Sequence, residues 1–113
     1  MQARFSYAIA FVADMDRAVA FHRDTLGLTL RFASPFWSEF ATGDTTLALH
    51  PASDDNAAGS VELGFAVDNL REFYDRREEL GLHFTRPPKE MHGVHIARFR
   101  DMDGAETSVS GPV

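Results

Sequence analysis

The chain has 113 residues, a formal net charge of −6 and no cysteine. Its hydrophobic and charged fractions, 44% and 25%, are typical of one globular domain with a substantial core, and no apolar run is long enough to cross a bilayer. These properties exclude disulfides and thiol nucleophiles, disfavour nucleic acid as a partner, and lead us to expect a cytoplasmic protein with no signal peptide and no membrane partner.

The first half of the chain predicts a strand, a helix and three further strands. In the strand, residues 5–12, the larger side chains of Tyr7, Ile9 and Phe11 alternate with small ones. Asp14 is a suitable N-cap for the helix, and Gly27 is a suitable residue to end it. The helix carries an apolar stripe at the spacing of one face: Met15, Ala18, Val19, His22 and Leu26. Residues 28–33, 37–41 and 46–50 are the expected strands.

The second half predicts the same order after a small, polar stretch at residues 52–60. A strand at 61–67 leads into a helix capped by Asn69 or Asp68, with a stripe of Leu70, Phe73, Tyr74 and Leu80. A strand at 82–86 ends at Pro87 and Pro88, and a polar loop at 89–93 follows, with His92 and His95 close to its end. Strands at 94–100 and 105–110 are joined by a tight turn at 101–104.

The two halves form an internal repeat. Val67 aligns with Val12, and Leu80-Gly81-Leu82 aligns with Leu26-Gly27-Leu28. A repeat of strand, cap, helix and terminating glycine predicts two βαβββ modules within a single domain. Module one is residues 1–53, the linker is 54–60 and module two is 61–113. The expected fold class is α+β, with the modules forming a curved half-barrel sheet, helices outside and a concave inner face. A second copy of the chain would finish covering the sheet, so we expect a homodimer.

Four segments of the sequence carry a resemblance to a known family. They are Val12-Ala13-Asp14, Ala20-Phe21-His22 with Leu26-Gly27-Leu28, Phe65-Ala66-Val67-Asp68, and residues 99–104. In these segments the chain resembles the vicinal oxygen chelate superfamily, which contains glyoxalase I, extradiol dioxygenases, fosfomycin-resistance enzymes and bleomycin-resistance proteins. Members usually have proline in place of Met102 and often tyrosine in place of His22. The resemblance implies the fold more strongly than an activity, because this fold hosts many activities.

The resemblance also implies four inner-face positions at which the family's enzymes hold a divalent metal. These positions fall on Tyr7, Ala48, Glu62 and Ser108, of which only Glu62 is a plausible ligand. Because such an ion needs about three good converging donors, we expect neither a metal nor another cofactor. The alternative is a displaced divalent-metal site made by Glu62, His50 and Glu106. Against it, a two-residue step along a strand moves a side chain by ~6–7 Å.

We expect seven residues to line a ligand pocket on the inner face: Tyr7, Trp37, Ala48, His50, Glu62, Glu106 and Ser108. Trp37 is the only tryptophan and lies next to a turn, which favours stacking on a flat ligand over core packing. Glu62 is a carboxylate on an otherwise apolar strand and therefore needs a partner. In a functional role the carboxylate accepts a hydrogen bond from a ligand, neutralises a cationic group, or acts as a general base. In a purely structural role it pairs with Tyr7, Arg98 or Arg100.

Three functions are consistent with these residues. The first is a metal-free protein of the bleomycin-resistance type that sequesters a small aromatic or cationic compound in a dimer-interface pocket. The second is a lyase, isomerase or dioxygenase-like enzyme that uses the displaced metal site or Glu62 as a base. The third is a structural dimer with a vestigial pocket.

Overall fold

The computed structural model describes residues 2–91 and 93–113, so His92 of the expected loop lies outside the described residues. Its elements are β1 (Arg4–Val12), α1 (Met15–Ala20), the π-helical turn η1 (Phe21–Thr25), β2 (Thr29–Phe32), β3 (Ser38–Ala41), β4 (Thr46–Pro51), β5 (Val61–Ala66), α2 (Leu70–Asp75), α3 (Arg77–Leu80), β6 (His83–Met91), β7 (Val94–Arg100) and β8 (Glu106–Ser110). None of the helices described is long and apolar enough to cross a membrane.

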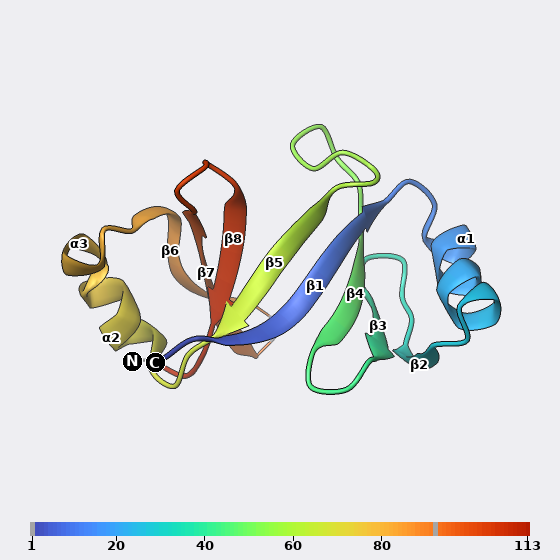
Figure 1. Ribbon diagram of the computed structural model, residues 1–113, viewed down its shortest axis with the longest axis horizontal. Helices are drawn as coiled ribbons and strands as arrows, with labels where there is room; N and C mark the ends of the chain where they lie inside the picture. Colours follow the sequence, from blue (N-terminus) through green and yellow to red (C-terminus); the bar gives the residue numbers. More distant parts are fainter. Residues whose placement is uncertain (1, 92) are drawn as a thin grey trace. The chain divides into compact units, whose positions relative to one another are not determined.

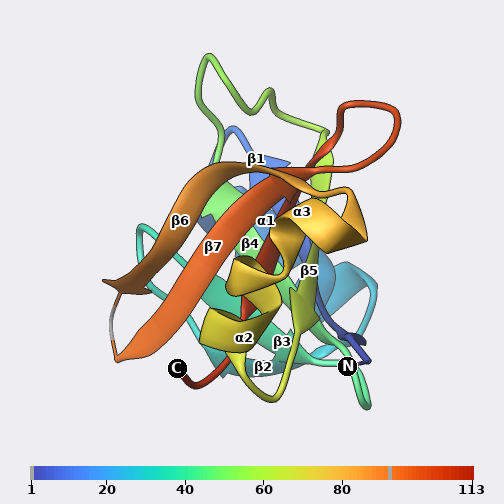
Figure 2. The same ribbon diagram turned by 90° about the vertical axis from the view of Figure 1, so that its left-hand side faces the viewer.

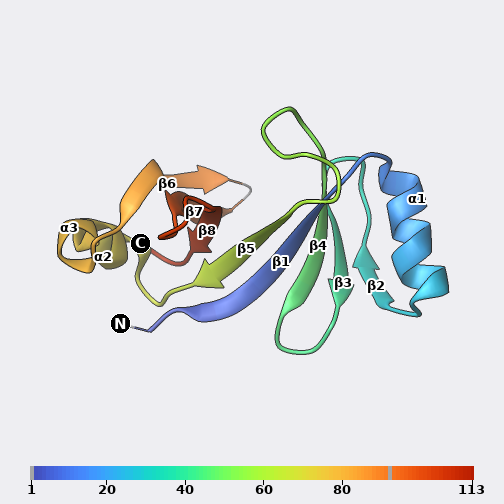
Figure 3. The same ribbon diagram turned by 45° about the horizontal axis from the view of Figure 1, so that its top comes forward.

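The chain folds into two compact units, which are described one at a time below. The first unit is Tyr7–Val61, and the second unit is Glu62–Val113 together with the described residues before Tyr7. In the first unit the strands lie in the order β2-β3-β4-β1, which Figure 3 shows most openly. β1 and β4 are parallel, with Ile9 opposite Ala48 and Phe11 opposite His50.

Helix α1 covers one face of the sheet of the first unit. Val19 of the helix packs with Phe40 of β3 and Leu49 of β4, and both of these side chains are fully buried. Asp14 caps the helix as expected, because its Oδ1 accepts a hydrogen bond of 3.1 Å from the backbone N–H of Arg17. Since side chains alternate across a strand, the residues between these core positions lie on the opposite face of the sheet.

The prediction of one regular helix running to Leu26 is wrong. After Ala20 the backbone continues as the π-helical turn η1, which is closed by a hydrogen bond of 3.1 Å from the Leu26 N–H to the Phe21 carbonyl. That five-residue step inserts one residue into the helical phase. Leu26 therefore leaves the apolar stripe and is 54% exposed, whereas His22 stays in the stripe and contacts the ring of Phe40.

The second unit repeats the plan of the first, with strands in the order β5-β8-β7-β6 and β5 parallel to β8. Figure 2 shows α2 and α3 lying across these strands. The core is formed by Val67, Leu70, Ala97 and Val109, with the rings of Phe65, Phe73, Phe84 and Phe99 packed around them. Asn69, and not Asp68, is the N-cap of α2, with an Oδ1 that accepts from Glu72 N–H at 3.0 Å. The predicted fold class, α+β built from two βαβββ modules, is confirmed.

Two details of the second unit differ from the expected ones. The expected single helix is divided at Arg76, and the change of phase leaves Leu80 42% exposed. The strand expected to end at Pro87 instead continues to Met91. β6 is the last strand in the order of this unit, and its register with β7 shifts between Arg86 and Lys89. Prolines fit there because an edge strand with an irregular ladder leaves their missing N–H groups without a required partner.

The described residues before Tyr7 belong to the second unit, although strand β1 begins among them and continues into the first unit. The Arg4 guanidinium donates to the Asp68 carboxylate at 2.8 Å, and the Phe5 ring lies 5.8 Å from that of Phe65, centroid to centroid. β1 therefore contributes its beginning to one unit and the rest of its length to the other (Figure 1).

Candidate functional site

The face of the first unit's sheet that lies opposite α1 carries a group of aromatic rings, which we call the aromatic face: Tyr7, Phe11, Trp37 and His50. The Trp37 ring contacts Tyr7 and His50 edge-on, with centroid distances of 6.0 and 6.2 Å. The Phe11 and His50 rings are 5.5 Å apart. Ile9 and Ala48 are buried beneath these rings. Four of the seven predicted ligand residues, Tyr7, Trp37, Ala48 and His50, are thus brought together in one unit.

A carboxylate fixes the tryptophan of the aromatic face. The Trp37 indole N–H donates to Glu39 Oε2 at 2.7 Å. The other oxygen of Glu39 accepts from Arg31 at 3.1 Å, and Arg31 also donates to Thr46 Oγ1 at 3.2 Å. The indole is therefore held in one orientation by a hydrogen-bonded chain across β2, β3 and β4. Sequence reasoning missed Glu39, although its two-residue spacing from Trp37 puts both on the same face of the strand.

The tautomer of His50 follows from its hydrogen bond. His50 Nδ1 lies 2.8 Å from the backbone carbonyl oxygen of Pro51. Because a carbonyl only accepts, Nδ1 carries the proton, and in the neutral ring Nε2 is an acceptor. The side chain is exposed, so the aromatic face offers a ligand one imidazole acceptor beside its rings.

Burial raises the pKa of the Tyr7 phenol above its ordinary value of 10.0. The negative charge of Glu39 raises it further, and the positive charge of Arg31 partly opposes the shift. The folded protein thus favours the neutral phenol. This contribution to stability is complete below about pH 10 and is lost as the pH rises through the pKa in the folded state.

We expect this shift to be measurable by absorbance at 295 nm during alkaline titration. The difference between the wild-type curve and that of Tyr7→Phe isolates Tyr7, and its midpoint should lie above about 10. Glu39→Gln should lower that midpoint, because it removes the negative charge that helps to raise the pKa. A midpoint at or below about 10 would contradict the burial of this hydroxyl.

The face of the second unit's sheet that lies opposite α2 carries a charged network, which we call the arginine–carboxylate face: Glu62, Thr85, Arg98, Arg100 and Glu106. Arg98 Nη2 donates to Glu62 Oε1, and Arg98 Nε lies 3.6 Å from Glu106 Oε2. Arg100 lies 3.5 Å from the other oxygen of Glu106, and Thr85 Oγ1 donates to Glu106 Oε2 at 3.0 Å. Glu62 is 7% exposed and is paired with Arg98, one of the structural partners considered from the sequence.

The residues at the family's metal positions do not fit a divalent cation. Ala48 has no donor atom and is fully buried, and the Glu62 carboxylate is already held by the Arg98 guanidinium. Ser108 stands opposite Arg98 in the register of β7 and β8, so a positive charge neighbours it. Glu106, from the displaced set, also shares its oxygens with arginines. Across the described ranges 2–91 and 93–113, no three His, Asp or Glu side chains are grouped to hold a metal.

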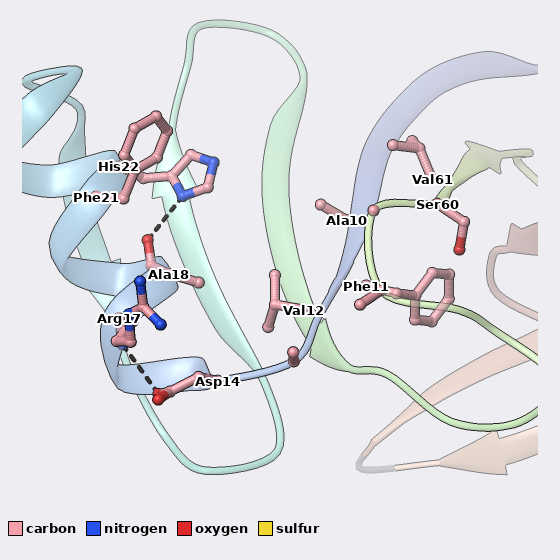
Figure 4. Close-up of a pocket in the computed structure, with 13 residues that line it drawn as sticks. Ala10, Phe11, Val12, Asp14, Arg17, Ala18, Phe21, His22, Ser60 and Val61 are labelled. Atoms are coloured by element: carbon pink, nitrogen blue, oxygen red, sulfur yellow. Dashed lines mark hydrogen bonds between the residues drawn. The ribbon is translucent and has the colours of Figure 1, made fainter.

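A hollow of about 450 Å³ lies elsewhere on the first unit, between α1, β1 and the end of the linker (Figure 4). Apart from buried Phe11, none of the aromatic-face residues lines it, and sequence reasoning did not predict it. Its polar groups are largely engaged locally. Asp14 caps α1, and His22 Nδ1 donates to the Ala18 carbonyl at 2.7 Å (Figure 4). The hollow therefore offers an apolar surface with few free hydrogen-bonding groups, and the aromatic face is chemically the richer candidate.

Two βαβββ units of this kind define a glyoxalase-like fold. A comparison of the sequence with models of known families identifies the family. The family model described as Glyoxalase/Bleomycin resistance protein/Dioxygenase superfamily matches residues 4–109. The chain belongs to this superfamily, which confirms the resemblance noted from its motifs. YurT, an uncharacterized protein of Bacillus subtilis (strain 168), is 31% identical over 111 residues, covering 83% of this chain and 87% of YurT.

Solved structures of other proteins share the fold at low sequence identity. Methylmalonyl-CoA epimerase from Mycobacterium tuberculosis has a TM-score of 0.80 at 16% identity, covering 96% of this chain and 87% of the epimerase. The hypothetical protein BH1468 from Bacillus halodurans C-125 has a TM-score of 0.83 at 11% identity, covering 100% of this chain and 96% of the other. At these identities the similarity establishes the fold and leaves the activity open.

Proposed function

We propose that this protein binds a small, flat aromatic compound on the aromatic face without using a metal. The observation that carries the proposal is the contact of Trp37 with both Tyr7 and His50, on the face of the sheet that α1 does not cover. Rings of this kind present π-faces and edges to a flat ligand, and such contacts contribute about 0.5–1.5 kcal/mol each beyond the area that they bury.

The polar groups of this face support a ligand with hydrogen-bonding substituents. His50 Nε2 is an acceptor, and the Tyr7 hydroxyl has no hydrogen-bond partner within residues 2–91 and 93–113. A phenol or an aromatic amide has a ring to stack and a group that pairs with one of these atoms. We therefore favour the aromatic class of ligand over the cationic class, because Glu62 and Glu106 are engaged by arginines and are not free to act as counter-ions.

The homodimer expected from the uncovered face of the sheet stays part of this proposal, and sedimentation velocity measures it. The enzyme alternative depended on Glu62 as a base or on a displaced metal site. No contact of Glu62 favours that alternative, since its carboxylate is paired with Arg98.

The fluorescence of Trp37, the only tryptophan, provides the test. The purified protein, dialysed against EDTA, is titrated with a panel of phenols, aromatic amides and quinolines. We expect saturable quenching by at least one compound, with an affinity that added Zn²⁺ or Mn²⁺ leaves unchanged. Tyr7→Leu should weaken that binding about 2- to 10-fold, because one edge-on ring contact is lost.

Phe21→Leu is the matched control, because Phe21 is half-exposed and lines the hollow beside α1, not the aromatic face. Its binding curve should match that of the wild type. If Phe21→Leu weakens binding and Tyr7→Leu does not, the hollow is the site and the assignment to the aromatic face is wrong. If no compound in the panel quenches Trp37 saturably, the vestigial-pocket hypothesis takes its place.

A further inference from the structure

Two arginines stand side by side on neighbouring strands of the second unit. Arg86 of β6 is the register partner of Arg98 of β7. Between Phe84 and Arg86 the register shifts by one residue, so Thr85 and Arg86 together face Arg98. Residues directly opposite one another in an antiparallel pair have Cβ atoms about 4.5–5.5 Å apart on the same face. The two guanidinium groups thus leave the sheet from adjacent points of the arginine–carboxylate face.

Both arginines have a buried donor that no acceptor satisfies. The Nε atoms of Arg86 and Arg98 are buried and have no hydrogen-bond partner in the described part of the chain. The Nε atom of Arg98 lies 3.6 Å from Oε2 of Glu106, which is beyond hydrogen-bond distance. A buried donor without a partner loses its hydrogen bonds to water and gains none in return, so such a group in a folded protein needs a reason.

Among the partly buried arginines of the described residues, Arg86 alone has a side chain without a partner: Arg76 and Arg98 pair with glutamates, and Arg77 donates to the Tyr74 carbonyl. Arg4, Arg23, Arg31 and Arg76 each pair with an aspartate or glutamate in the same unit. The side chain of Arg86 forms neither a hydrogen bond nor an ion pair with any described residue, yet the residue is partly buried. Holding a guanidinium in this way, next to a second one, is unfavourable unless an anion is present to neutralise it.

The arginine–carboxylate face carries a net positive charge, which also favours the binding of an anion. Three arginines, Arg86, Arg98 and Arg100, stand against the two carboxylates of Glu62 and Glu106, which are occupied by Arg98 and Arg100. One positive charge is left over, and it belongs to the arginine that has no partner. A guanidinium presents its donors as a planar fork that matches the oxygens of a carboxylate or a phosphate.

We propose that Arg86, with Arg98 beside it, is a binding site for the oxyanion group of a small molecule, either a carboxylate or a phosphate. Arg86 supplies the paired N–H donors, and Arg98 adds a second positive charge while remaining bound to Glu62. The site lies within the second unit. It depends on neither the aromatic face nor its proposed ligand. An experiment that refutes one of the two proposals therefore leaves the other unaffected.

The test is an NMR titration of the arginine Nε–H signals of the full-length protein. The probes are sodium acetate and methyl phosphate, added at constant ionic strength against sodium chloride. The Arg86 signal is assigned by its loss in Arg86→Met. We expect this signal and that of Arg98 to shift saturably with at least one probe. A tenfold preference for acetate or for methyl phosphate identifies the carboxylate or the phosphate as the group recognised.

Two variants make the result specific. In Arg86→Met the shift of the Arg98 signal should require at least tenfold more probe. In Arg71→Met, which removes an exposed arginine of α2 with the same change in net charge, the titration should match that of the wild type. If Arg86→Met does not fold, Arg86→Lys keeps the charge but loses the planar fork, and it should still bind more weakly than the wild type. The site is refuted if neither probe gives a saturable shift, or if the Arg86 variants bind as the wild type does.

Discussion

Replacing Arg98 with methionine is expected to lower the free energy of unfolding by about 3–5 kcal/mol, because the substitution leaves a buried carboxylate without its partner. Glu62 is 7% exposed, and its hydrogen bond from Arg98 is the one that its carboxylate makes within the described residues. Glu106 loses the same guanidinium from one side. The loss is measured by urea denaturation followed by far-UV circular dichroism.

The double variant Glu62→Met/Arg98→Met decides the cause of that loss. Replacing both members of a buried ion pair with apolar groups is often nearly neutral, so the double variant should recover most of the stability. Arg100→Met is the matched control, since Arg100 is half-exposed and its pair with Glu106 should contribute less than about 1 kcal/mol. Equal losses in Arg98→Met and Arg100→Met would contradict the claim that the buried Glu62–Arg98 pair matters more for stability than the exposed Arg100–Glu106 pair.

Phe40→Ala is expected to cost about 3–5 kcal/mol, the range for removing a large aromatic side chain from a core. Phe40 has no exposed surface, and it lies between the sheet and α1, where it contacts Val19, Leu49 and the ring of His22. Its loss removes the contact that keeps His22 in the helix stripe. The measurement is again the urea midpoint, together with the slope of the transition.

Phe32→Ala serves as its control, because Phe32 of β2 is 46% exposed and its truncation leaves no closed cavity. The loss for Phe32→Ala should stay well below that for Phe40→Ala. A Phe40→Ala protein that unfolds at the wild-type midpoint would contradict the core assignment of the first unit.

The parts of the fold that depend on short-range chemistry were predictable from the sequence. Asp14 and Asn69 cap the two helices through hydrogen bonds to residues three positions later. The expected turn at 101–104 is present, because Asp101 Oδ1 accepts from the N–H groups of Asp103 and Ala105 at 2.9 Å each. Such signals lie within a few residues of one another, so they can be read from the sequence without knowing the fold.

Features that depend on long-range context were not predictable. The π-helical turn after Ala20 has no residue signature that distinguishes it from a regular helix. Pro87 and Pro88 signal the end of a strand unless the strand is known to be at an edge. In the site, alternation correctly grouped Tyr7, Ala48 and His50 because β1 and β4 pair in regular register. It could not place Arg86 opposite Arg98, because that pairing depends on a shift of register. The cytoplasmic location and the homodimer stay predictions.

The beginning of β1 limits how this chain could exchange parts with its relatives. Because Arg4 and Phe5 contact Asp68 and Phe65, the second unit is encoded by two separate stretches of the sequence. A genetic crossover at the linker would join residues 1–60 of one parent to residues 61–113 of another. The hybrid would then assemble one unit from two parents, with the Arg4–Asp68 pair and the Phe5–Phe65 contact each drawn from both. These contacts are preserved when the whole coding sequence is inherited from one parent, and not when its two halves come from different parents.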